Sequence, residues 1–129
     1  MEKTAVVVLV LFLVVGTAYA RGYEVQKTAG EYDVQVLIDK NPPITGDNGV
    51  SITIRDTAGK TVKDVQVKLE YSMPAMPGMP AMNYKTDATL QGDAYQAVMS
   101  LSMSGSWNIA VKIIKAGKIS SMKFTVDAK

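Results

Sequence analysis

Methionine is the residue type whose spacing in this sequence points to chemistry. Eight methionines occur in 129 residues, and four of them, separated by prolines, fall within ten residues: Met73, Met76, Met79 and Met82. A thioether is soft and uncharged and cannot act as an acid, a base or a nucleophile. Among the common metals it suits Cu(I). The pattern therefore predicts a Cu(I) site at these four residues, with Met103 as a further metal ligand.

The conformation expected for this segment limits how the sulfur atoms could meet. Proline occupies every third position from Pro74 to Pro80, which fixes φ near −65° and favours a polyproline II rod over a helix or a ladder strand. On such a rod the four thioethers share one face and attach roughly 9 Å apart. Sulfur ligands of one ion lie within about 4–5 Å of each other, given metal–sulfur bonds of about 2.3 Å. Metal binding would therefore need a bend at Gly78 or a contribution from Met103.

Two other interpretations of the methionine and proline segment stay open. Long, flexible methionine side chains also fill irregular gaps over the edge of a β-sandwich. A stripe of exposed apolar side chains also suits the docking of a partner protein. Met99 and Met122 belong with core packing, because each shares the parity of its apolar neighbours.

The composition excludes most catalytic machinery. The chain has no cysteine and no histidine, so disulfides, thiolate zinc sites, cysteine nucleophiles and Ser-His-Asp triads are all ruled out. Ser120 and Lys123 fit a Ser-x-x-Lys pattern, but that motif needs a helical turn and these residues lie in an alternating run. The formal net charge of +2 gives no electrostatic case for nucleic acid. We therefore predict a protein that is not an enzyme and does not bind nucleic acid.

The N-terminal residues predict export. Glu2 and Lys3 precede an apolar run from Thr4 to Val15, and Ala18-Tyr19-Ala20 supplies the small residues of a cleavage site. Residues 1–20 therefore resemble a secretory signal peptide cleaved after Ala20, in an extracytoplasmic protein that is periplasmic or secreted. The alternative is an uncleaved membrane anchor, although about 17 apolar residues is the lower limit for a span. Membrane contact is expected only if this N-terminal helix is retained.

The rest of the chain predicts an all-β domain. After a polar lead-in, residues 21–30, nearly every segment alternates apolar and polar residues, as a strand with one buried face does. Turn residues separate the runs at Asn41–Pro43, Gly46–Gly49, Thr57–Lys60 and Ala116–Lys118. This predicts an immunoglobulin-like antiparallel β-sandwich of about seven strands over residues 31–129. Trp107 is in phase with core positions, so we expect it to be a core anchor.

Three segments together resemble a known family. They are Leu69–Pro80 with the Met-Pro repeat, Gly92–Ala97 with Gly-x-x-Tyr, and Leu101–Val111 with Met-x-Gly-x-Trp. In this order they look like the YtkA-like domain, which is related to FixH-type proteins, over roughly residues 33–126. The resemblance implies an extracytoplasmic immunoglobulin-like domain, often membrane-anchored or attached to metal-efflux components. FixH-type relatives are linked to the assembly of copper-containing terminal oxidases, so the partners implied are a membrane metal transporter or an oxidase-assembly component.

These observations combine into one functional hypothesis and one alternative. The hypothesis is an exported, non-enzymatic β-sandwich whose Met-Pro loop makes Cu(I) contacts in metal handling or oxidase assembly. Neutral thioethers should bind weakly and exchange readily, so transfer of the metal is favoured over storage. The alternative is an extracytoplasmic interaction or scaffold module with a structural methionine stripe.

Overall fold

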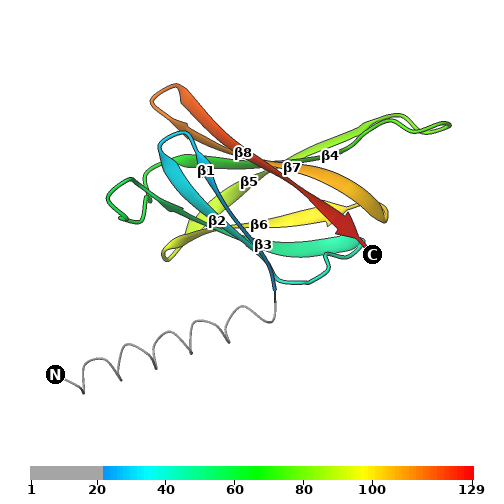
Figure 1. Ribbon diagram of the computed structural model, residues 1–129, viewed down its shortest axis with the longest axis horizontal. Coiled ribbons are helices and arrows are strands. Elements are labelled where there is room, and N and C mark those ends of the chain that lie inside the picture. Colours follow the sequence, from blue (N-terminus) through cyan, green and yellow to red (C-terminus); the bar gives the residue numbers. More distant parts are fainter. Residues whose placement is uncertain (1–21) are drawn as a thin grey trace, which may run out of the picture.

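The computed structural model describes residues 22–129, which form eight β-strands (Figure 1). All neighbouring strands pair antiparallel. The strands are β1 (Tyr23–Ala29), β2 (Tyr32–Ile38), β3 (Gly46–Arg55), β4 (Gln66–Met73), β5 (Met82–Gln91), β6 (Ala94–Leu101), β7 (Gly105–Lys115) and β8 (Lys118–Ala128).

The strands follow the order β1-β2-β3-β6-β5-β4-β7-β8 and fold over into two layers. One layer holds β1, β2, β3 and β6, and the other holds β4, β7 and β8. Strand β5 belongs to both, because its first part pairs with β4 while Thr89–Gln91 pairs with β6. The all-β antiparallel sandwich predicted from the alternation is confirmed.

The two edge strands nearly close the sandwich into a barrel. At this seam the Lys27 ammonium of β1 donates to the carbonyl oxygen of Lys123 at 2.9 Å, and the Tyr23 hydroxyl donates to the carbonyl oxygen of Thr125 at 3.4 Å. Two side chains of β1 thus bond to two backbone carbonyls of β8, which helps to protect that edge from pairing with another chain. Within residues 22–129 no helix is long and apolar enough to cross a membrane.

The core is formed by alternate side chains of the strands, those that point between the two layers. Trp107 is fully buried, and Met99 and Met122 are 0% and 4% exposed, so the predictions of a core tryptophan and two packing methionines are confirmed. Two tyrosines also tie the layers together: Val65 N–H donates to the Tyr95 hydroxyl, and Ser100 N–H donates to the Tyr71 hydroxyl, each at 3.3 Å. The largest fully buried side chains are Trp107, Ile38, Ile52, Ile54, Leu69, Met99, Leu101, Ile109, Ile113, Val34, Val36 and Val50.

Two predictions about individual segments are wrong. The polar lead-in, residues 21–30, contains strand β1, which raises the strand count from about seven to eight. The sequence predicts a turn at Gly46–Gly49, but this segment begins strand β3 and pairs with β6. In both cases polar residues pair with a neighbouring strand, because backbone hydrogen bonds between strands do not require apolar side chains. The predicted N-terminal signal or anchor helix lies outside the described residues.

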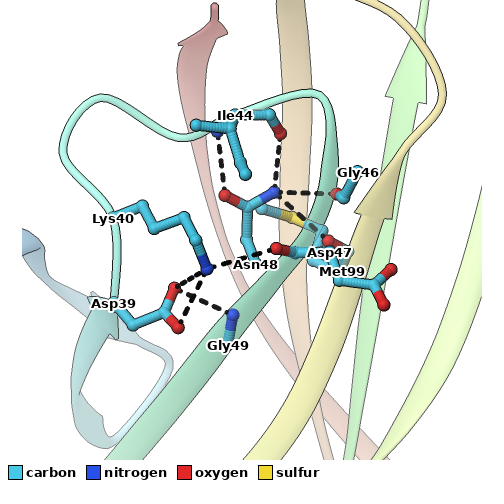
Figure 2. A network of polar contacts seen from close by, with 8 residues as sticks. All are labelled: Asp39, Lys40, Ile44, Gly46, Asp47, Asn48, Gly49 and Met99. Atoms are coloured by element: carbon cyan, nitrogen blue, oxygen red, sulfur yellow. Dashed lines mark hydrogen bonds and ion pairs between the residues drawn. The ribbon is translucent and has the colours of Figure 1, made fainter.

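Asn48 explains how a polar segment becomes a buried strand (Figure 2). Its side chain is completely buried, and its Oδ1 accepts from Ile44 N–H at 2.9 Å while its Nδ2 donates to the carbonyl oxygen of Ile44 at 2.8 Å. The same Nδ2 also reaches the carbonyl oxygens of Gly46 and Met99. The amide therefore replaces missing backbone partners and fixes the Pro42–Thr45 loop against the end of the sandwich.

The three other predicted turns are confirmed: Asn41–Pro43 lies in the connection between β2 and β3, and specific contacts or backbone angles define the remaining two. In the first, Asp56 closes the turn at residues 57–60 by accepting from the N–H groups of Ala58 and Lys60 at 2.9 and 3.0 Å. In the second, Ala116 and Gly117 have φ angles of 53° and 79° and connect β7 to β8. Positive φ at both central positions is the pattern of a two-residue hairpin turn.

Candidate metal centre

The methionine and proline segment is the end of a β-hairpin. Met73, the last residue of β4, lies directly opposite Met82, the first residue of β5. Farther out, Met76 and Met79 exchange two backbone hydrogen bonds of 3.0 and 2.8 Å. Between them Gly78 has a φ of +82°, which with Pro77 before it is the pattern of a type II turn.

The predicted polyproline II rod is therefore wrong. The turn at Pro77-Gly78 reverses the chain, so methionines that a rod would spread along one face become cross-strand pairs. Directly opposite residues of an antiparallel pair have Cβ atoms about 4.5–5.5 Å apart. The bend at Gly78, one of the two conditions that the sequence argument named for metal binding, is present, and it sets methionines opposite one another in pairs.

Three of the five predicted ligands gather at the base of the hairpin, and we call Met73, Met82 and Met103 the inner methionines. Met82 Sδ accepts a hydrogen bond from Ser102 Oγ at 3.5 Å, beside Met103. The Met73 methyl carbon would lie only 3.2 Å from a Cβ added at Gly105. Met73 is 3% exposed, and Met82 and Met103 are partly buried against the core. The hairpin base and the β6–β7 loop thus bring these three side chains to one end of the sandwich.

Aromatic rings lie beside the inner methionines and hold their loop. Tyr71 and Tyr84 stack at 5.5 Å between ring centroids, and each ring lies 6.1 Å from that of Trp107. The Trp107 Nε1–H donates to the carbonyl oxygen of Met103 at 3.0 Å. Trp107 therefore has a second role besides core packing, since it fixes the backbone of a predicted metal ligand. Sequence reasoning missed this role and that of Ser102.

The remaining two predicted ligands, Met76 and Met79, are separate, and we call them the tip methionines. They are 42% and 38% exposed, at the end of the hairpin that projects from the sandwich (Figure 1). Met76 lies three positions after Met73, and Met79 three positions before Met82, which corresponds to roughly 10 Å along an extended strand. The structure therefore divides the five predicted ligands into two groups, which do not form one site.

Residues 26–112 match the sequence profile described as YtkA-like. The chain belongs to the YtkA-like family. Among solved structures it is similar to the crystal structure of FetP from uropathogenic E. coli strain F11, recombinantly expressed in the periplasm of E. coli. The TM-score is 0.58 at 9% sequence identity, and the match covers 84% of this chain and 96% of the FetP chain. At this identity the likeness shows a shared fold. Comparison with curated proteins gives no significant match.

A groove of this YtkA-like domain has no methionine in its lining, although it reaches Tyr71 and Tyr84 beside the inner methionines. It has a volume of about 750 Å³ and follows β4, β7 and β8, with residues of β1 and β5 at its sides. Its floor carries the ion pair between Lys112 and Glu70, with an N···O distance of 3.0 Å. Lys115 and Lys118 of the same hairpin also pair with acids, Asp64 and Glu31.

The perturbed ionisable groups lie away from the inner methionines. A hydrogen bond and the charge of Lys115 lower the pKa of Asp64, and the same contact raises the pKa of Lys115. Lys63 lowers the pKa of Asp93 in the same way, at 2.7 Å. Asp64 and Lys115 lie at the ends of β4 and β7 opposite to Met73 and Gly105. In residues 22–129 no three His, Cys, Asp or Glu side chains gather as a metal site.

Proposed function

We propose that this YtkA-like domain is an exported, non-enzymatic protein that binds Cu(I) through its inner methionines and serves in metal handling or oxidase assembly. The observation that carries the proposal is the hairpin register, which sets Met73 opposite Met82 beside the loop of Met103. A straight rod would have kept these sulfur atoms apart.

The donor set fits a soft monovalent ion. Three neutral thioethers add no charge, so the complex keeps the single positive charge of Cu(I), and harder divalent ions find no oxygen-rich set there. Tyr71, Tyr84 and Trp107 stack beside the base of the hairpin, and the rings of Tyr71 and Trp107 are buried. Three uncharged ligands at a partly buried position favour binding that is selective and reversible, which suits a protein that passes the metal on.

The competing function is an interaction or scaffold module with structural methionines. Met73 favours it, because a side chain that is 3% exposed contributes to packing whether or not a metal binds. Met76 and Met79 are too exposed for a packing role. The two functions therefore differ in whether sulfur itself is needed.

A Cu(I) competition titration against a chromophoric chelator tests the proposal. The wild type should take Cu(I) from the chelator, and M73L/M82L/M103L should lose at least tenfold in affinity, because leucine keeps the apolar bulk and removes the sulfur. M99L/M122L is the matched control, since those methionines are core residues of β6 and β8 and are not among the candidate ligands. Equal affinity of the wild type and M73L/M82L/M103L would favour the scaffold function.

Export is part of the proposal and has its own test. FetP, which shares the fold, was expressed in the periplasm. A mature chain that begins at Arg21, measured by intact mass after expression in an exporting host, would support cleavage after Ala20. Full-length chain retained in washed membranes would instead favour an uncleaved anchor.

A further inference from the structure

The tip methionines offer two soft donors, half of the four that a tetrahedral site holds. We propose that Cu(I) binds between the hairpin tips of two copies of this chain, so that Met76 and Met79 of each copy supply four thioethers to one shared ion. The inference rests on the proposed thioether chemistry, but it uses different residues from the inner site and predicts a different result, a metal-dependent dimer.

The tip cannot complete a ligand set by itself. Met76 and Met79 are neighbours across the hairpin and exchange both backbone hydrogen bonds, so their side chains can approach a common ion. The rest of residues 74–81 are proline, alanine and glycine, which offer no side-chain donor. A soft ion held by two thioethers alone keeps open coordination positions, as in an incomplete tetrahedral site.

The inner methionines are poorly placed to fill those positions. Met73 and Met82 lie about 10 Å away along the hairpin, counting three residues of extended strand on each arm. Met73 is also buried in the core and packs toward Gly105. The missing ligands at the tip must therefore come from another molecule.

A second copy of the chain fits this requirement. The tip projects beyond the sandwich, and residues 71–84 carry no charged side chain, so two tips can meet without like-charge contact between them. Each tip presents the same pair of soft donors, as a two-fold symmetric interface requires. A different partner would need to bring its own exposed pair of soft ligands.

Sedimentation velocity tests the inference on the protein purified after export, with Cu(I) under anaerobic conditions and with Ag(I) as a soft ion of the same closed-shell type. The sedimenting mass of the wild type should double when the metal added beyond saturation of the inner site reaches half an equivalent per chain. A strong Cu(I) chelator should restore the monomer. M73L/M82L/M103L should still dimerise.

The matched variant is M76L/M79L, in which leucine keeps the apolar bulk of an exposed tip and leaves the fold unchanged by circular dichroism. It should stay monomeric at every metal ratio while retaining the inner-site affinity. A wild type that binds metal at the inner site and stays monomeric overturns the tip inference alone. A dimer that persists in M76L/M79L also overturns it. A wild type that binds no Cu(I) and no Ag(I) overturns both this inference and the proposed function.

Discussion

At the scale of single residues, burial divides the methionines into core residues, which include the candidate ligand Met73, and the exposed tip residues Met76 and Met79. Parity in the sequence is enough to place Met99 and Met122 in the core. The same parity runs from Val67 through Leu69 and Tyr71 to Met73, and it signals that Met73 is a core residue. Pro74 follows Met73 directly and begins the regular spacing of prolines, so the sequence argument placed Met73 in the polyproline II rod.

A pair of alanine substitutions should show this division in stability. Met99→Ala should lower the free energy of unfolding by about 2–5 kcal/mol, because it leaves a cavity among fully buried side chains. Met76→Ala should change it by less than about 0.5 kcal/mol, since the side chain is exposed. Urea unfolding followed by circular dichroism measures both. Similar losses in the two variants would mean that the tip packs against the core.

Trp107 should be the most costly single truncation near the candidate site. Trp107→Ala should lower the free energy of unfolding by about 3–5 kcal/mol, because the ring is fully buried between the layers. Trp107→Phe keeps much of that burial but removes the Nε1–H donor to Met103. We expect this variant to fold and to bind Cu(I) more weakly. Unchanged Cu(I) affinity in Trp107→Phe would show that the hydrogen bond does not position the Met103 loop.

At the scale of elements, the hairpin is the feature that the sequence argument misjudged. Pro77-Gly78 is a dipeptide typical of turns, and Gly78 is the one position at which the sequence argument allows a bend. The regular spacing of the prolines nevertheless favours a rod, because each proline alone is compatible with extended structure. What decides the fold is the pairing of β4 with β5, a contact between segments that local residue preferences do not contain.

The turn between β7 and β8 carries a residue that is poorly suited to it. Ala116 adopts a φ of 53°, a left-handed conformation that costs an L-residue with a Cβ roughly 1–2 kcal/mol. Ala116→Asn should therefore raise the free energy of unfolding by about 0.5–1 kcal/mol, since asparagine tolerates this region and is preferred in such turns. Thermal unfolding monitors the change. A variant less stable than the wild type would argue against the two-residue turn.

Asn48 is the polar support of the loop at the methionine end of the sandwich. Asn48→Ala should cost about 1–3 kcal/mol, because the Ile44 N–H and carbonyl lose their partners. Asn48→Asp keeps the acceptor but turns a carboxylate toward the carbonyl oxygens of Ile44 and Gly46. Those oxygens should raise the pKa of the new carboxyl above its unfolded value.

The Asn48→Asp variant should therefore lose stability relative to the wild type as pH rises above about 3.9, the ordinary aspartate value. Below that pH the protonated carboxyl can donate in place of the amide, so the difference should shrink. Urea unfolding at several pH values measures it. A stability difference that does not depend on pH would show that the side chain at position 48 is not enclosed by these carbonyls.

At the scale of the whole molecule, the alternation of apolar residues predicts the architecture and most of the core, because a strand that buries one face carries apolar residues at alternate positions. It does not predict β1 or the first residues of β3, whose side chains are largely polar and whose place is set by pairing and by Asn48. The sequence predicts the five candidate ligands but not their division into inner and tip methionines, since that division depends on which strands pair. The sandwich brings the end of β4, the start of β5 and the β6–β7 loop together, and this convergence makes the inner methionines a group.

The most direct test of the account is an NMR titration of the protein labelled with ¹³C at the methionine methyl groups, using Ag(I) or anaerobic Cu(I). Each methyl reports on its own sulfur. We expect the signals of Met73, Met82 and Met103 to shift together with the first ion added, while those of Met99 and Met122 stay in place because these core side chains of β6 and β8 do not belong to the inner methionines. Shifts absent from all three inner methionines, or equal shifts in the core pair, would contradict a thioether metal site at the base of the hairpin.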